Sequence, residues 1–376
     1  MNGFPSFDHQ PRTRIVFGNG AADRAGELAR QINVKKVLLV TDAGILAAGH
    51  AERVRESLGE AKVQVALFDS VQENPTTADV DACLAVAREA GIDGIVGLGG
   101  GSSMDTAKGC NFLLTNGGRM QDYWGVGKAT RPMLPLIAIP TTAGTGSECQ
   151  SFALIADADT HQKMACGDPK AAAQIAILDP SLTVSQPARV AACTGIDALS
   201  HALETAVTQK RNALSLAYSR ESFRLCNGSL GRVLQKGGDL EARAGMLMGA
   251  ALAGLAIENS MLGAAHAAAN PLTAHFHLVH GQAVGMMLAA VIRFNAADPE
   301  TARVYEELDP SLAEKVDELL NLAGMPRSLA DCGLKPSAIP QLAAEAAKQW
   351  TASFNPRPVA EKDFVELFEA AFNSRR

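Results

Sequence analysis

The first half of the chain alternates short apolar runs with amphipathic segments. Apolar runs with the length of buried strands lie at residues 36–42, 62–69, 91–100 and 134–142. Segments with helical periodicity lie between them, at residues 20–32, 50–58 and 77–91. Strands that alternate with helices predict βαβ units and a parallel sheet.

The pattern changes near the middle of the chain. Residues 151–166 predict a hairpin around an Asp/Thr turn, and residues 172–180 predict a last strand. Ser185 and Pro187 then have the residue types of a helix N-cap and first turn. Beyond them the apolar residues recur at helical spacing. We therefore expect an α/β domain over residues 1–184 and an all-helical domain over residues 185–376.

Composition narrows the class of protein. The 376 residues, 47% hydrophobic and 20% charged, are typical of a globular protein with two domains. The net charge of −6 argues against a general nucleic-acid partner, which needs a basic face. The longest apolar run, residues 246–257, is too short to span a membrane, so we expect a buried helix and no membrane partner.

The cysteines and the N-terminal residues indicate the compartment. The seven cysteines are scattered, odd in number and form no C-x-x-C pair. This usage predicts reduced thiols, most of them in the core. The first twenty residues contain no apolar segment of the kind found in secretory signals. We expect a cytoplasmic protein.

Two loops rich in small residues follow predicted strands. The first, GLGGGSSMDTAKG at residues 97–109, opens a predicted helix, where glycines allow a close approach and free N–H groups bind an anion. Its Ser102 and Ser103 can cap the helix or donate to a phosphate. The second, PTTAGTGSE at residues 140–148, can line the same edge of the sheet. The alternative is that the glycines only shape a β–α turn.

Asp42 ends the strand VLLVTD. A carboxylate at that position near a dinucleotide site binds the ribose 2′-hydroxyl and repels a 2′-phosphate. The alternative is a solvated Asp that caps the next turn.

A carboxylate and several histidines have the pattern of a metal site. Asp197 and His201 are four residues apart in a helical segment, so both project from one face. His266 and His280 would lie roughly 21 Å apart along one straight helix. They can share an ion only if the chain folds back, and we expect Pro271 to break the helix between them. Such an ion can polarise a carbonyl or stabilise an alkoxide. The oxygen and nitrogen ligands do not select the metal.

These motifs together resemble one family. GGGSSMDTAKG, PTTAGTGSE and GIDALSHALE, followed by two histidines separated by thirteen residues and a Gly after the second, resemble the iron-containing (group III) alcohol dehydrogenases. The resemblance implies an α/β N-terminal domain with a Rossmann-like parallel sheet and an all-α C-terminal domain, the dehydroquinate synthase-like architecture. It also implies a homodimer.

The resemblance assigns roles to individual positions. It implies four metal ligands, for Fe(II) or another divalent ion such as Zn(II): Asp197, His201, His266 and His280. It implies NAD as the cofactor, with Asp42 at the acidic position that favours NAD over NADP. The cofactor-binding residues it implies are Asn74, Pro75, Thr76, Gly99, Gly100, Gly101, Ser102, Ser103, Asp105, Thr141, Thr142, Thr145 and Lys163.

The chain departs from the family at one position. Many members carry a second His four residues after the third ligand, where this chain has Asn270. A neutral amide cannot accept the proton of an alcohol at pH 7. His277 lies three residues before His280, and in a helix it would share a face with that ligand. We hypothesise that His277 relays the proton. The alternatives are water, the ribose hydroxyl of the cofactor, or a purely structural role for His275 and His277.

We therefore expect an oxidoreductase that transfers a hydride between NAD(H) and a small alcohol or aldehyde, with the metal polarising the substrate oxygen. Phe152, Ile257 and Met261 predict an apolar substrate pocket. One alternative is an NAD- and metal-dependent sugar-phosphate cyclase of the dehydroquinate synthase type. That enzyme needs Lys and Arg around the metal motifs, and these motifs contain almost none. The other alternative is an NAD-binding protein without catalytic activity.

Overall fold

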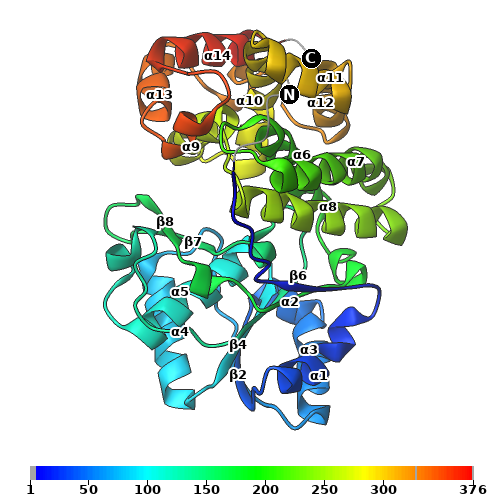
Figure 1. Ribbon diagram of the computed structural model, residues 1–376, viewed down its shortest axis with the longest axis vertical. Coiled ribbons are helices and arrows are strands. Elements are labelled where there is room, and N and C mark those ends of the chain that lie inside the picture. The colour runs from blue at the N-terminus through cyan, green and yellow to red at the C-terminus, as the bar shows by residue number, and fades with distance from the viewer. Residues whose placement is uncertain (1–5, 327, 375–376) are drawn as a thin grey trace. The chain divides into compact units, whose positions relative to one another are not determined.

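The computed structural model describes residues 6–326 and 328–374, and it divides the chain into two compact units (Figure 1). One unit is Gln10–Gln186, and the other combines Pro187–Arg376 with the segment that ends at His9. Residues 1–5, part of the segment on which we judged the absence of a secretory signal, lie outside the described residues.

The N-terminal segment belongs with the helices rather than with the sheet that follows it in sequence. His9 Nδ1 lies 2.9 Å from Asn259 Oδ1, and the His9 ring lies 6.2 Å from the ring of Tyr218. Both partners are about two hundred residues or more away in the sequence. No local pattern indicates such a contact, and for this reason the expected domains assigned this segment to the α/β part.

The first unit is built on a parallel sheet, as the sequence predicts, and this sheet has six strands. The strand order is β1-β9-β6-β4-β2-β3, and every pairing is parallel. The strands are β1 (Arg14–Phe17), β2 (Lys36–Val40), β3 (Gln64–Phe68), β4 (Gly94–Gly99), β6 (Leu136–Pro140) and β9 (Ile175–Leu178). The edge strand β1 was not expected, because its four residues are too few to show a period.

Helices cover both faces of this sheet (Figure 1). On β2, Val37 and Leu39 point into a core with α1 (Ala25–Gln31) and α3 (His50–Glu60). Leu38 and Val40 point to the other face, against α4 (Thr77–Ala90) and α5 (Gly101–Asn116). Consecutive strand residues alternate in direction, so a strand that is buried on both faces is apolar throughout.

A small second sheet adjoins α5, in the order β5-β8-β7. Strands β7 (Phe152–Ala156) and β8 (Lys163–Gly167) form the predicted antiparallel hairpin, and β5 is Gly125–Val126. The Asp157 carboxylate shapes the turn, because its Oδ1 accepts from the N–H groups of Asp159 and Thr160 at 3.0 and 2.8 Å. This confirms the expected Asp/Thr turn.

The second unit is helical. Its helices are α6 (Ala188–Val207), α7 (Ala213–Gln235), α8 (Leu240–Glu258), α9 (Ala264–Phe276), α10 (His280–Asn295), α11 (Pro299–Leu308), α12 (Leu312–Leu322), α13 (Ile339–Ala346) and α14 (Glu361–Asn373). The predicted Ser185 N-cap is wrong. Helix α6 has Pro187 at its N-cap position, and the Ser185 hydroxyl instead lies 2.7 Å from His50 Nε2. Because the hydroxyl of Ser185 is used in this contact with a distant residue, Ser185 does not cap α6.

The apolar run at residues 246–257 lies within α8, which is longer than the run itself. Among the described helices, α8 alone is long and apolar enough to cross a membrane, with 19 residues. Most of its apolar window, 61%, is buried inside the fold, where α8 packs against α6 and α7. A core helix that is rich in Ala and Gly has this composition because small side chains let its neighbours approach.

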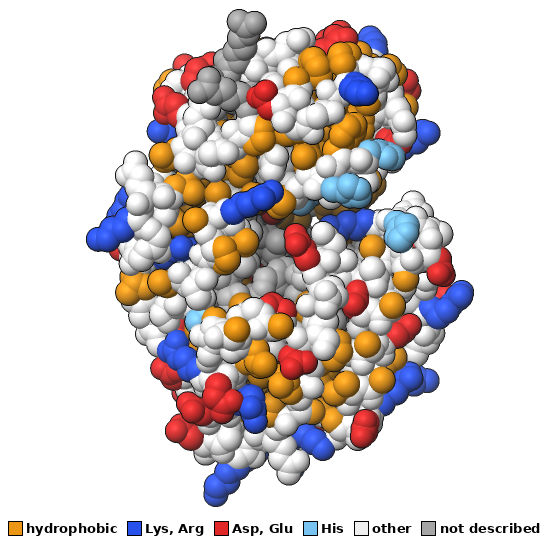
Figure 2. Space-filling model, turned by 180° about the vertical axis from the view of Figure 1, so that it is seen from behind, with side chains coloured by type: hydrophobic (Ala, Val, Ile, Leu, Met, Phe, Trp, Pro, Cys, Tyr) orange, Lys and Arg blue, Asp and Glu red, His pale blue; other side chains and the backbone are white. Residues whose placement is uncertain are grey.

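The face of the molecule in Figure 2 mixes charges of both signs. Lys and Arg side chains are interspersed there with Asp and Glu. Apolar side chains are scattered between them, which is normal for a globular surface. The exposed large apolar residues include Val126, Trp124 and Phe17.

Helix α10 packs against α6 through a glycine in its first turn. A Cβ on Gly281 would lie 2.1 Å from the carbonyl oxygen of Cys193 and 3.2 Å from Asp197 Cβ. The carbonyl belongs to the backbone of α6, so it cannot move aside as a flexible side chain would. The absence of a side chain at Gly281 therefore sets the distance between the two helices.

We predict that Gly281→Ala lowers the free energy of unfolding by about 1–3 kcal/mol, because the added methyl group overpacks the contact between α6 and α10. Gly228→Ala on α7 is the matched control. A Cβ there meets nothing within 4 Å, and Gly228 is exposed. Alanine at that position raises the stability by up to about 1 kcal/mol. Denaturant unfolding measures both variants, and an unchanged stability of Gly281→Ala would contradict the packing account.

Candidate functional site

The turn between β4 and α5 has a conformation that requires glycine. Gly99 has a φ of +145°, and a Cβ there would lie 2.3 Å from Ser103 Oγ. Helix α5 begins after Gly100, and no described side chain caps it. The expected caps Ser102 and Ser103 therefore do not act as caps. The first N–H groups of α5 stay free of a side-chain acceptor, which suits them to bind an anion.

The two predicted loops meet at the ends of adjacent strands. Strands β4 and β6 are paired, and Thr141 N donates to the Gly99 carbonyl at 2.9 Å. A Cβ on Gly100 would contact the Thr142 side chain at 3.5 Å. A Cβ on Gly101 would lie 2.9 Å from Thr145 Cγ2. Glycine is thus the residue that lets the second loop lie against the first.

Asp42 lies at the same edge of the sheet. Its Oδ1 accepts from Ile45 N at 3.0 Å and caps the short helix α2 (Ala43–Ala47), so the capping role that we left open is present. Its Oδ2 lies 3.4 Å from the position of a Cβ on Gly99. One carboxylate oxygen is therefore used in the cap, while the other faces the glycine-rich turn.

The loop before α4 reaches the same turn. Asn74 N donates to Ser102 Oγ at 3.3 Å, and Asn74 is exposed in the left-handed conformation. Pro75 is buried, and its carbonyl accepts from Ala156 N at 2.9 Å. The Thr76 hydroxyl forms a capping box with Asp79 at the start of α4. Of the three, Asn74 has the most direct contact with the predicted nucleotide-binding turn.

A fully buried lysine connects the two loops to α5. Lys108 Nζ donates to the Ser147 carbonyl at 2.6 Å, to Ser147 Oγ at 2.8 Å and to the Phe152 carbonyl at 2.9 Å. The Ser147 hydroxyl in turn donates to Asp105 Oδ1 at 3.0 Å. The pKa of Asp105 is raised, because the effect of burial is larger than the opposing effects of Lys108 and the exposed Lys163. This network fixes Asp105 relative to the second loop.

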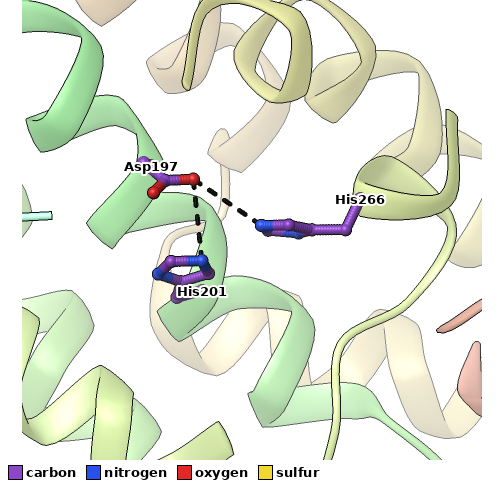
Figure 3. A group of neighbouring side chains, drawn as sticks. All are labelled: Asp197, His201 and His266. Carbon is purple, nitrogen blue, oxygen red and sulfur yellow. Dashed lines mark ion pairs between the residues drawn. The ribbon is translucent and has the colours of Figure 1, made fainter. Parts of the chain in front are cut away.

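In the helical unit, α6 and α9 bring three predicted ligands together (Figure 3). Asp197 Oδ1 lies 3.6 Å from His201 Nε2 and 3.6 Å from His266 Nε2. The rings of His201 and His266 are stacked with centroids 4.8 Å apart. All three residues are buried, and one ligand atom from each lies within 4.8 Å of the others.

His280 lies beside this group, but the chain reverses at a different point from the one we expected. The prediction that Pro271 breaks the helix is wrong, because α9 continues through Pro271 to Phe276. Pro271 is buried and forfeits only one backbone hydrogen bond, which packing outweighs. The reversal occurs at His277, which has a φ of +52°, and α10 begins at His280. The His280 ring is then 5.4 Å from the His266 ring.

The donor set fits a divalent ion. Ligand atoms about 2.1 Å from one tetrahedral ion lie roughly 3.4 Å from each other, close to the separations of 3.6 Å found here. Asp197 Oδ1 and His266 Nε2 are buried and form no hydrogen bond with any described residue. Buried polar atoms without a partner are costly, and a bound cation satisfies both of them.

Sequence reasoning missed Glu204, although it lies in the quoted motif GIDALSHALE. Its carboxylate is buried, with Oε2 2.5 Å from His266 Nδ1. Burial lowers the pKa of His266, but Glu204 and Asp197 outweigh that effect and raise it to about 9. Burial raises the pKa of Glu204, but His266 lowers it by more. The spacing of Glu204 could have identified it, because residues 197, 201 and 204 share one face of a helix.

The remaining candidates lie apart from this group or on its margin. Asn270, one turn after His266 on α9, donates to Gln349 Oε1 at 2.9 Å. His275 is exposed and lies 2.7 Å from Glu345 Oε2. His277 is exposed and outside a helix, so the helix-face argument for His277 is wrong.

The predicted pocket residues belong to both units. Ile257, near the end of α8, and Met261 after it are buried in the helical unit. Phe152 starts β7 in the sheet unit and is half-buried. Its ring lies against Gly167, where a Cβ would be 2.4 Å from Phe152 Cε1.

Comparisons with known proteins cover nearly the whole chain. The model of the iron-containing alcohol dehydrogenase family matches residues 11–180, and that of the C-terminal part of the Fe-containing alcohol dehydrogenase family matches residues 191–372. An NAD-dependent methanol dehydrogenase of Bacillus methanolicus is 34% identical, over 95% of this chain and 97% of the relative. A choline dehydrogenase of Bacillus subtilis is 36% identical, over 96% and 94%.

A solved structure agrees with these relatives. The crystal structure of a 1,3-propanediol oxidoreductase superposes with a TM-score of 0.94 at 33% identity, covering 98% of this chain and 100% of that one. The expected fold class is thereby confirmed. The matches support an alcohol dehydrogenase over the sugar-phosphate cyclase that the sequence left open. The chain belongs to the iron-containing alcohol dehydrogenase family.

Proposed function

We propose that this protein transfers a hydride between NAD(H) and a small alcohol or aldehyde, with a divalent metal held by Asp197, His201, His266 and His280. The observation that carries the proposal is the buried group in Figure 3, where a carboxylate oxygen and an imidazole nitrogen lack hydrogen-bond partners among the described residues. Family membership and the donor spacing support the same function.

The protein's own residues bind and orient the reactants. One carboxylate and three imidazoles would hold the ion, and Gly281 allows α10 to carry His280 close to α6. When bound, the metal supplies a Lewis acid for the substrate oxygen. Asp197, His201 and His266 are buried, which excludes water from their side of the ion and strengthens the electrostatic interaction with that oxygen.

We infer that the metal in the cell is Fe(II), as the family's name indicates for its members. Oxygen and nitrogen ligands also accept Zn(II), which binds such sites more tightly than Fe(II) does. Occupancy therefore depends on metal supply as well as on the ligands.

We infer that the sheet unit, residues 1–184 in the expected division, binds the NAD, and that the helical unit binds the metal. The free N–H groups of α5 and Gly99–Ser103 suit the pyrophosphate. Asp42 suits the adenosine ribose, with Asn74, Pro75 and Thr76 beside it. Asp105 and the threonines of the second loop, Thr141, Thr142 and Thr145, suit the nicotinamide side, and Lys163 lies within electrostatic reach of Asp105.

The identity of the alcohol substrate is a separate question from the type of reaction. The names of the relatives specify methanol, choline and 1,3-propanediol as substrates. Family membership alone therefore does not select a substrate. We propose that Ile257 and Met261 in the helical unit, and Phe152 in the sheet unit, are apolar residues of the substrate pocket, which favours small alcohols with an alkyl chain. A substrate with a phosphate group would need basic residues, and the motifs around the metal ligands contain almost none.

We propose that His277 relays the proton released from the alcohol, because Asn270 cannot accept it. Its exposure gives it access to water, and it occupies the turn between the two helices that carry His266 and His280. We also infer a cytoplasmic homodimer. The seven cysteines form no disulfide among the described residues, and six of them are buried, which suits a reducing compartment. The dimer rests on the family resemblance alone.

We predict that His266→Ala and His280→Ala each remove metal and activity together. Protein loaded with Fe(II) under anaerobic conditions forms NADH with a panel of small primary alcohols, and both variants lose this activity. Elemental analysis of the same samples gives the metal content. His275→Ala is the control, because its exposed ring pairs with Glu345 away from the ligands. Full metal content in both variants would contradict the ligand assignment. Full metal without NADH formation in the wild type would contradict the activity.

We predict a preference for NAD over NADP that depends on the charge of Asp42. Asp42→Ser keeps an acceptor for the N-cap of α2 but removes the charge that repels a 2′-phosphate. Its KM for NADP should fall with little change in kcat, and Asp42→Gly should behave alike. Steady-state kinetics with both cofactors measures this. A wild type that uses NADP as well as NAD would refute the role of Asp42.

We predict that His277→Asn lowers kcat/KM for alcohol oxidation and shifts its pH profile. Asn tolerates the positive φ of this position, so the variant removes the imidazole without straining the turn. Asn270→His should raise the rate near neutral pH, because it restores a base at the position where relatives carry one. An unchanged rate and pH profile for His277→Asn would exclude the relay and leave water as the proton acceptor.

A further inference from the structure

Two polar contacts join Glu204 on α6 to the first turn of α9. Its Oε2 accepts from His266 Nδ1 at 2.5 Å, and its Oε1 accepts from Ala265 N at 2.7 Å. The side chain is 4% exposed, so water does not compete for either oxygen. Both carboxylate oxygens are thus occupied by donors from consecutive residues of α9.

The contact with His266 determines which ring nitrogen faces the metal group. An imidazole with its proton on Nδ1 leaves a lone pair on Nε2, and Nε2 is the atom 3.6 Å from Asp197 Oδ1. A carboxylate at Nδ1 both selects this tautomer and fixes the ring orientation. Glu204 does not reach the ion, because its oxygens are used on the far side of the ring.

The contact with Ala265 determines where α9 begins. The helix starts at Ala264 after Gly263, and its N-terminal N–H groups need acceptors. Ala265 N finds one in Glu204, and Ala264 N finds another in Asn355 Oδ1 at 3.2 Å. A negative charge at a helix N-terminus is also favourable. Glu204 therefore fixes the position of the helix that carries His266 as well as its ring.

The negative charge of Glu204 also matters for binding of the ion. Three neutral imidazoles and Asp197 leave a divalent ion with one uncompensated positive charge, next to the buried side chains of Asp197, His201 and His266. Glu204 supplies the second negative charge, one imidazole ring away, so that the site as a whole is neutral with the ion bound. An uncompensated buried charge is costly, and the carboxylate lowers that cost.

We propose that Glu204 is a positioning residue of the metal site: it selects the Nδ1–H tautomer of His266, fixes the start of α9 and balances the charge of the ion. The proposal rests on the proposed metal site. An amide cannot replace the carboxylate, because a glutamine has one acceptor atom for two donors. Either Ala265 N or His266 Nδ1 then loses its acceptor and faces the NH₂ group of the glutamine.

The test is metal affinity, measured by chelator competition with Co(II) and Zn(II), together with the visible spectrum of the Co(II) form. Glu204→Gln should weaken binding by about 10–100-fold and change the Co(II) spectrum. Glu204→Asp keeps the charge and should recover part of the affinity. Asn355→Ala is the control for disruption at the start of α9. It removes the other side-chain acceptor there, together with hydrogen bonds to Asn295 and Arg357, without touching His266. Its affinity should stay close to that of the wild type.

Nitrogen-15 NMR of labelled histidines gives a second readout that does not depend on a folded variant. In the Zn(II)-loaded wild type, His266 should carry its proton on Nδ1. Retained affinity and an unchanged Co(II) spectrum in Glu204→Gln would overturn the proposal, as would a His266 without a proton on Nδ1. A wild type that binds neither ion would instead refute the metal site itself, so the two failures are distinguishable.

Discussion

The helical unit depends on the pairing of two buried carboxylates on α6 with an imidazole from α9. Asp197 and Glu204 lie on opposite sides of the His266 ring, at Nε2 and Nδ1 respectively. Together they raise the pKa of His266 to about 9 against the effect of burial. Negative charges on both sides of the ring also stabilise a cation bound at Nε2. The ligand arrangement and the packing of α6, α9 and α10 therefore reflect the same charges.

The sheet unit, where we propose that NAD binds, depends on a different buried charge. Lys108 is fully buried, and it donates to the carbonyl and hydroxyl of Ser147 in the second loop and to the carbonyl of Phe152 at the start of β7. A buried ammonium group needs such partners, because its desolvation is costly. The lysine thus holds the loop against α5, and through Ser147 it holds Asp105. A local motif, GGGSSMDTAKG, in this way contains both the turn that we propose for the pyrophosphate and the residue that supports its surroundings.

The sequence predicted well those elements that depend on residues close together in the chain. The parallel strands, the hairpin at Asp157 and the pair at residues 197 and 201 each follow from periodicity or from turn chemistry. Contacts between distant residues were not predictable in this way. Ser185 bonds to His50 instead of capping α6, and α9 continues through Pro271 because tertiary packing outweighs one lost hydrogen bond. The segment that ends at His9 packs on the helical unit for the same kind of reason.

Glu204 is an intermediate case. Its spacing of seven residues from Asp197 indicates a shared helix face, but only the start of α9 shows what the carboxylate contacts. Resemblance to the family supplied the four proposed ligands, whereas this supporting residue came from the geometry. A His266 ring that rotates freely would be a poor ligand, and its two neighbouring carboxylates prevent that rotation.

We propose that one divalent ion binds between α6, α9 and α10. Anomalous diffraction at the iron absorption edge, on crystals of protein loaded anaerobically with Fe(II), is the decisive measurement. One peak should appear for each chain, about 2.1 Å from Asp197 Oδ1 and from a ring nitrogen of each of the three histidines. A peak at other residues, or a fully loaded protein with no peak between Asp197 and His266, would contradict it.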